Sequence, residues 1–288
     1  MHIKDNVPCY GVVGNPIEHS KSPIIHNAFS IQTGISIKYD KILTSEEYFS
    51  KTIKDFFESN GLGLNITVPF KKKAFEIIPY NNISERAKLA KAINTIWKKD
   101  NNLYGCNTDG VGLLKDINRL NFNLHNANIL IIGAGGAARG VLEPLILSKP
   151  SKIHIVNRTK INAENLLNDF IHSTTIKTNL KISYGGLSET NSEKPWDIVI
   201  NTTASELNGE SLDLPKLTFN PKKSLAYDIM YGSNKTSFLL KAENEGALQC
   251  VDGLGMLVEQ AAESFFIWHG VRPETNKVLD EIRQLISS

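Results

Sequence analysis

Short apolar stretches alternate with helix-like segments along almost the whole chain. The run over 128–133 is apolar enough for a buried strand, and apolar residues recur at helical spacing over 46–59. Residues typical of helix ends support these assignments. Pro23 suits the first position of a helix, and Gly34 suits the position where that helix ends. Strands that alternate with helices favour parallel pairing, so the pattern predicts an α/β protein with helices on both faces of a sheet.

The pattern also predicts where each element lies. Strands are expected at 9–14, 36–43, 62–68, 128–133, 152–157, 197–203 and 224–230, with a hairpin over 93–107. Helices are expected at 22–34, 46–59, 84–92, 109–120, 137–148, 161–171, 255–270 and 276–286. Ser84 is a plausible N-cap for its helix, because its hydroxyl can accept from a backbone N–H of the first turn.

Composition and charge exclude several classes of protein. The net charge of +2 gives no broad electrostatic basis for binding nucleic acid or an anionic membrane. No apolar run approaches the roughly 18 residues that span a bilayer, and the first ten residues lack the apolar core of a signal peptide. Cys9, Cys106 and Cys250 lie far apart without CxxC spacing, so neither a disulfide framework nor a metal site is expected. We therefore expect a cytoplasmic protein.

A glycine-rich turn joins the strand at 128–133 to the helix at 137–148. Glycines there let the backbone approach a pyrophosphate, and the helix that follows offers unpaired N–H groups to it. The third glycine of the common pattern is replaced by alanine, which suffices where only close helix packing is needed. The alternative is a tight turn without a ligand. The residues expected to hold a dinucleotide here are Gly133, Ala134, Gly135, Gly136 and Ala137.

The end of the next strand indicates which dinucleotide is bound. An NAD site usually places a carboxylate there for the ribose 2′-hydroxyl. This chain instead has Asn157, Arg158, Thr159 and Lys160, and the two cations can neutralise a 2′-phosphate. The residues therefore favour NADP over NAD, and the alternative is an ordinary polar strand end.

Seven motifs together resemble the shikimate dehydrogenase family. They occur in order from residue 9 to about 270, which makes the resemblance far more specific than the glycine turn alone. The motifs are GNPIEHSKSPIIHN (14–27), NITVPFK (65–71), AINT (92–95), NTDGVG (107–112), GAGGAARG (133–140), NRT (157–159) and DGLGMLVEQAA (252–262). The resemblance implies a reversible, NADPH-dependent reduction of 3-dehydroshikimate to shikimate in aromatic amino-acid (chorismate) biosynthesis.

The resemblance also implies a set of substrate-binding residues. Ser20 and Ser22 match the serines that bind the substrate carboxylate; without the family, Ser22 would most simply be a helix cap. The other matching positions are Thr67, Asn94, Asp109, Tyr231 and Gln260. Local alternatives are a strand face open to solvent for Thr67, an N-cap for Asp109 and a solvated helix position for Gln260.

Three consecutive lysines follow the strand at 62–68. A run of like charge is usually a solvated face, and Lys72 and Lys73 keep that interpretation as part of a solvated first helical turn. The family motif ends at Lys71, so the resemblance makes Lys71 the catalytic acid and base, with Asp109 as its carboxylate partner. On the strand itself, Leu64, Ile66 and Val68 are expected on one face and Asn65 and Thr67 on the other.

Further cofactor positions come only from the resemblance. They are Thr203, Ile229, Gly253 and Glu85. The chain departs from the family pattern at Cys106, whose role is open, at Glu206, which places a charge in the loop 201–209, and at Asn162, which replaces a second arginine of some members.

The expected fold is α/β with two domains around a cleft. Residues 1–108 and 253–288 would form a substrate-binding domain with a mixed or parallel sheet, and 109–252 a Rossmann-like NADP-binding domain. We expect small-molecule partners, no nucleic acid, membrane or metal, and a monomer or homodimer. Two alternatives are a quinate/shikimate dehydrogenase that uses NAD and a cofactor-sensing regulator without catalysis. Intact Lys71 and Asp109 disfavour the regulator.

Overall fold

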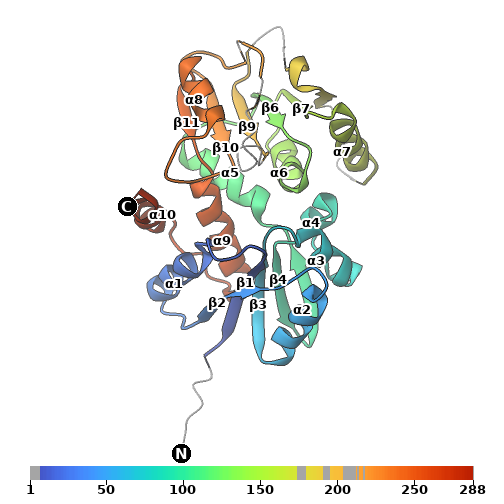
Figure 1. Cartoon of the computed structure of the whole chain (residues 1–288), viewed down its shortest axis with the longest axis vertical. Helices are drawn as coiled ribbons and strands as arrows, with labels where there is room; N and C mark the ends of the chain where they lie inside the picture. Colours follow the sequence, from blue (N-terminus) through green and yellow to red (C-terminus); the bar gives the residue numbers. More distant parts are fainter. Residues whose placement is uncertain are drawn as a thin grey trace, which may run out of the picture. The chain divides into compact units, whose positions relative to one another are not determined.

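The elements of the chain form two units in the computed structural model (Figure 1). One unit comprises the described parts of Met1–Gly112 and Val258–Ile286, and the other those of Leu113–Leu257. The structure describes residues 7–173, 180–190, 195–203, 212, 214–216 and 218–287. Among these residues, no helix is both long and apolar enough to cross a membrane.

The first unit is built on a five-stranded mixed sheet of order β2-β1-β3-β4-β5. Parallel strands β1–β3 come first, and an antiparallel hairpin of β4 and β5 completes the sheet. The strands are β1 (Cys9–Gly14), β2 (Lys38–Leu43), β3 (Gly61–Ile66), β4 (Thr95–Lys99) and β5 (Asn102–Cys106). The predicted hairpin is confirmed, and its turn has positive φ at Asp100 and Asn101, a conformation that polar turn residues tolerate.

Helices cover both faces of this sheet. On one face, α2 (Phe49–Glu58), α3 (Lys71–Ile77) and α4 (Glu85–Ala90) bury apolar side chains against residues such as Leu64. On the other face lie α1 (Ser22–Thr33) and α9 (Leu254–His269). Helices α5 (Asp109–Arg119) and α10 (Asn276–Ser287) and the short 3-10 helix η1 (Tyr80–Asn82) complete the elements that lie wholly or partly in this unit.

The second unit has a six-stranded sheet of order β11-β10-β9-β6-β7-β8, parallel throughout. Its strands are β6 (Asn128–Ile132), β7 (Lys152–Val156), β8 (Lys181–Gly185), β9 (Ile198–Asn201), β10 (Leu225–Asp228) and β11 (Gln249–Val251). The helices are α6 (Gly136–Leu147), α7 (Lys160–Ser173) and α8 (Ser237–Asn244), with the 3-10 helix η2 (Leu187–Glu189). The chain leaves β6 on one side through β7 and β8 and returns to its other side at β9, which is the doubly wound order of dinucleotide-binding sheets.

The predicted α/β class, with a mixed sheet and a Rossmann-like parallel sheet, is confirmed. One expectation within it is wrong: β3 ends at Ile66 rather than at residue 68, and Val68 is 68% exposed instead of buried beside Leu64. The physical reason is that the backbone turns out of the sheet before Pro69, which has no N–H for a ladder. Helix α8 and strands β8 and β11 were not anticipated.

Candidate active site

The catalytic pair expected from the sequence lies together in the first unit. Lys71 is the first residue of α3 and Asp109 the first residue of α5. The Lys71 Nζ donates to Asp109 Oδ2 at 2.6 Å, and the two side chains are 30% and 9% exposed. The lysine is therefore held by a largely buried carboxylate while its own side chain stays partly exposed, as a group that exchanges a proton with a ligand must be.

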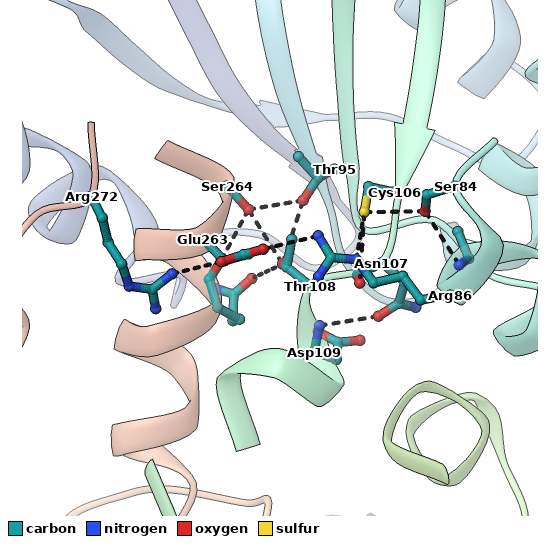
Figure 2. Close-up of polar contacts among 12 residues, drawn as sticks. Ser84, Arg86, Thr95, Cys106, Asn107, Thr108, Asp109, Glu263, Ser264 and Arg272 are labelled. Atoms are coloured by element: carbon teal, nitrogen blue, oxygen red, sulfur yellow. Dashed lines mark hydrogen bonds and ion pairs between the residues drawn. The ribbon is translucent and has the colours of Figure 1, made fainter. Parts of the chain in front are cut away.

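Neighbouring amides fix the orientation of the Asp109 carboxylate. Asn94 Nδ2 donates to its Oδ1 at 2.8 Å, so both oxygens have a donor. Asn107 Oδ1 accepts from the Asp109 backbone N–H at 3.0 Å (Figure 2). Asn107 Nδ2 donates to the Ala92 carbonyl. Asp109 is the first residue of α5, and side chains rather than helix N–H groups are the donors found for its carboxylate.

Asn94 is the centre of a larger buried network. Its side chain is almost fully buried, and its Nδ2 also lies 2.9 Å from Thr108 Oγ1 and 3.4 Å from Gln260 Oε1. Thr95 and Ser264, which the sequence interpretation missed, extend the network through a 2.8 Å contact between their hydroxyls (Figure 2). Thr95 adjoins Asn94 in the AINT motif. Nothing in the sequence marks Ser264, because the sequence does not show which residues of α9 face β4.

Asn65 connects this network to the edge of the sheet. Its Nδ2 donates to Ser264 Oγ at 3.0 Å, and its Oδ1 accepts from the Tyr39 hydroxyl at 2.7 Å. Burial raises the pKa of Tyr39 well above its ordinary value, so this hydroxyl remains a donor. A polar side chain on an otherwise buried strand needs hydrogen-bond partners, and Asn65 has them on both sides of its amide. Thr67 is half-buried, and its N–H donates to the Val13 carbonyl.

The two serines lie at the entry to α1. Ser22 is the first residue of that helix and 7% exposed, while Ser20 is half-buried. The Ser20 Oγ accepts from the Ser22 N–H at 3.3 Å, and no side chain caps α1. The alternative that Ser22 is the helix cap is therefore wrong. Their predicted role in holding a carboxylate stays a prediction.

Cys106 has defined partners at the end of β5. Its Sγ lies 2.9 Å from Arg86 Nε and 3.2 Å from Ser84 Oγ (Figure 2). Ser84 also accepts from the Ala87 N–H, so the predicted N-cap is confirmed. Cys106 thus helps to anchor the strand end that leads to Asp109.

The glycine turn lies at the carboxyl end of β6, where the strand order of the second unit reverses. Gly133 has φ of 107°, a conformation that side chains rarely adopt, and a Cβ there would lie 2.5 Å from Thr202 Oγ1. Gly135 and Gly136 are exposed with open space beside them, and no side chain caps α6. The turn can therefore accept an anionic ligand at the helix N-terminus. Ala134 and Ala137 are half-buried beside these glycines.

Two glycine variants should separate folding from binding at this turn. Gly133→Ala should lower the free energy of unfolding by about 2 kcal/mol, because it adds both backbone strain and a clash. Gly135→Ala should change that free energy by less than about 0.5 kcal/mol but weaken dinucleotide binding about tenfold, because its methyl would occupy the approach to the pyrophosphate. Urea unfolding and calorimetric titration with NADP measure the two effects; equal losses of stability in both variants would contradict the assignment.

The predicted 2′-phosphate residues follow β7. Asn157 Nδ2 donates to the Thr159 carbonyl at 3.0 Å, and Arg158 and Thr159 are exposed. Lys160 is also exposed, but its Nζ lies 2.9 Å from both carboxylate oxygens of Glu189, a partner that the sequence did not reveal. The described part of the chain brings no three metal-ligating side chains together.

The remaining predicted cofactor positions are distributed over both units. Thr203 donates through its N–H and hydroxyl to Asn201 Oδ1. Gly253 is buried, and a Cβ there would lie 2.1 Å from the Ile229 carbonyl oxygen, so only glycine fits. The Glu85 side chain is 82% exposed and pairs with a lysine one turn along α4. Glu206 falls outside the described residues.

Tyr231, a predicted substrate contact, is half-buried in the second unit. Burial, and then the negative charge of Asp252, raise its pKa above the ordinary value, so its hydroxyl is a donor across the neutral range.

Fold and site together define a two-unit α/β protein, with a dinucleotide-binding type of sheet in one unit and a partly buried lysine–carboxylate pair in the other. Models of the shikimate dehydrogenase substrate-binding domain, the shikimate/quinate 5-dehydrogenase and the shikimate 5′-dehydrogenase C-terminal domain match residues 12–96, 116–209 and 253–283. The shikimate dehydrogenase (NADP(+)) of Bordetella petrii is 46% identical over 277 residues, which cover 96% of each chain. The chain belongs to the shikimate dehydrogenase family.

Solved structures agree with this membership. An Ael1 enzyme from Pseudomonas putida is 39% identical with a TM-score of 0.86, covering 95% of this chain and 97% of its own. Shikimate 5-dehydrogenase from Thermus thermophilus, in complex with NADP(H) and shikimate, is 27% identical with a TM-score of 0.82, covering 96% and 99% of the two chains.

Proposed function

We propose that this protein is an NADP-dependent shikimate dehydrogenase that catalyses the reversible reduction of 3-dehydroshikimate to shikimate. The observation that carries the proposal is the Lys71–Asp109 ion pair, oriented by Asn94. Relatives that are named shikimate dehydrogenase (NADP(+)) and align over nearly the whole chain support the substrate and the cofactor. The reaction serves aromatic amino-acid (chorismate) biosynthesis.

Lys71 supplies the proton chemistry. When bound, NADPH supplies the hydride that reduces the ketone carbon of the substrate. The ammonium of Lys71 stabilises the negative charge that develops on the carbonyl oxygen and gives that oxygen a proton. In the oxidation of shikimate, neutral Lys71 accepts the proton of the same hydroxyl. Asp109 positions the Nζ through their 2.6 Å hydrogen bond, and Asn94 keeps the carboxylate from rotating.

Other side chains select the substrate. The hydroxyls of Ser20 and Ser22 donate to its carboxylate, as two donors close in sequence can. Asn94 and Gln260 bind ring hydroxyls, because an amide both donates and accepts. Thr67 and Tyr231 complete the set with hydroxyl groups.

The nucleotide is held by the turn over Gly133–Ala137 and selected at the end of β7. Arg158 is the principal cation for a 2′-phosphate, since a guanidinium binds phosphate in bidentate fashion. The other polar residues proposed to bind the nucleotide at the end of β7 are Asn157, Thr159 and Lys160. Secondary cofactor contacts are proposed at Thr203, Ile229, Gly253 and Glu85. The three cysteines form no disulfide in the structure, and we infer a cytoplasmic location from their spacing and free state.

A spectrophotometric assay of NADP reduction by shikimate tests the proposal. We expect robust turnover with NADP and shikimate, and much lower kcat/KM with NAD or with quinate. Faster turnover with NAD and quinate would instead support a quinate/shikimate dehydrogenase. Absence of turnover together with tight NADP binding would support the non-catalytic regulator.

A further inference from the structure

Lys160, at the end of β7, forms an ion pair with Glu189. Lys160 is the first residue of α7, and its Nζ donates to Glu189 Oε1 and Oε2 at 2.9 Å each. The two side chains are 52% and 48% exposed, so solvent and ligands can reach the pair. Their mutual hydrogen bond is the largest cause that raises the pKa of Lys160 and lowers that of Glu189, so both groups are charged near neutral pH.

The fold places Glu189 at the same sheet edge as the predicted 2′-phosphate residues. Strands β7 and β8 are parallel neighbours with Val156 opposite Gly185, and the Asn157 N–H donates to the Gly185 carbonyl at 3.2 Å. Glu189 ends η2, directly after β8. A Cβ on Gly185 would lie 2.9 Å from the Glu189 Cβ, so Glu189 folds back over the strand end.

The backbone of Glu189 is fixed in that position. Its N–H donates to the Gly186 carbonyl at 2.9 Å, and its own carbonyl accepts from a ring nitrogen of His154 at 3.0 Å. His154 is itself buried on β7 between this contact and Ser183. The carboxylate therefore reaches Lys160 from a rigid support rather than by chance contact of two mobile side chains.

We propose that Glu189 is a specificity-determining residue that limits the preference of this protein for NADP over NAD. Glu189 holds Lys160 in an ion pair, and a 2′-phosphate must compete with that carboxylate for the ammonium. NAD carries no 2′-phosphate, so its binding gains nothing from Lys160 and loses nothing to Glu189. This inference rests on the proposed use of NADP.

The size of the effect follows from the exposure of the pair. Exposed ion pairs are weak and screened, so a phosphate can displace Glu189 at a modest cost. Release of Lys160 should therefore strengthen NADP binding about three- to tenfold, and the gain should shrink as salt is added. Arg158 remains the principal cation in either case.

Three variants of the full chain test the proposal by calorimetric titration with NADP and with NAD. Glu189→Gln should lower the NADP dissociation constant about three- to tenfold and leave that of NAD within about twofold. Lys160→Gln should abolish this gain when it is combined with Glu189→Gln. Glu243→Gln is the matched control, because it breaks the exposed Lys235–Glu243 pair elsewhere in the same unit and should change neither constant.

Three outcomes would overturn the inference: unchanged NADP binding in Glu189→Gln, an equal gain for NAD, or a gain that persists in the double variant. The last would mean that Glu189 acts by direct repulsion and not through Lys160. Failure of the proposed function is distinguishable, because it appears as absence of shikimate-dependent NADP reduction by the unaltered protein, whereas these titrations need no second substrate.

Discussion

Lys71→Ala should lower kcat for NADP reduction by shikimate about a thousandfold, since a positioned acid or base typically contributes about 10²–10⁴. The KM for shikimate should change far less, because the serines and amides that bind the ring are untouched. Asp109 keeps its hydrogen bond from Asn94 in the variant, so the fold should survive. Steady-state kinetics with both substrates varied gives the two constants.

Lys72→Ala is the matched control for this experiment. Lys72 is the next residue in the same helical turn and is exposed, so it loses the same charge without touching Asp109. We expect near-normal turnover in the control and an unchanged far-ultraviolet circular dichroism spectrum in both variants. Turnover of Lys71→Ala within about tenfold of normal would assign the proton transfer to another group.

The three consecutive lysines differ in ways that a local charge pattern predicts only in part. Charge alone favoured a solvated helix start, and Lys72 behaves that way. Lys73 is only partly exposed, because it donates to the Glu46 carbonyl at 2.5 Å. Only the family motif and the pairing with Asp109, 38 residues away in sequence, distinguish Lys71 from Lys72 and Lys73 as the catalytic residue.

Strand and helix assignments succeeded where periodicity and cap residues agreed. Helix α1 has Pro23 in its first turn and ends at Gly34 with φ of 71°, as those residues predicted. Strand β11 is not predicted because its three residues are too few to show an alternation of apolar and polar side chains. Strand β8 is not predicted because its residues are mixed in polarity. Helix α8 does carry a sequence signal, because threonine is a favoured N-cap residue, and in the structure Thr236 accepts from the Leu239 N–H.

The partners of site residues were much less predictable than the residues themselves. Asn65 and Lys160 carried local signals, but their partners Ser264 and Glu189 reach them only through the tertiary structure. A sequence pattern states which faces are polar and not which polar groups meet. Lys160 illustrates the consequence, because its charge favoured a phosphate while the fold supplies a competing carboxylate.

The largest expected loss of stability follows from Glu263→Ala. Glu263 lies on α9 between two arginines: its Oε1 accepts from Arg86 on α4 at 2.9 Å and its Oε2 from Arg272 at 2.6 Å (Figure 2). The Glu263 side chain is 13% exposed and the arginines 25% and 28%. Removing one member of a largely buried ion cluster leaves like charges without their shared partner. We expect the free energy of unfolding to fall by about 3 kcal/mol, as measured by urea denaturation.

Partial compensation keeps this loss from being larger. Arg86 retains its contact with Cys106, and Arg272 retains Glu259, whose Oε2 accepts from it at 2.8 Å. Glu281→Ala, on the exposed face of α10, is the control that removes a carboxylate without a cluster, and it should stay within about 0.5 kcal/mol of the unaltered protein. Glu263→Gln should fall between the two, because an amide can still accept from one arginine. Equal stabilities of the Glu263→Ala and Glu281→Ala variants would mean that the cluster contributes no net stability, because its desolvation cost cancels its attraction.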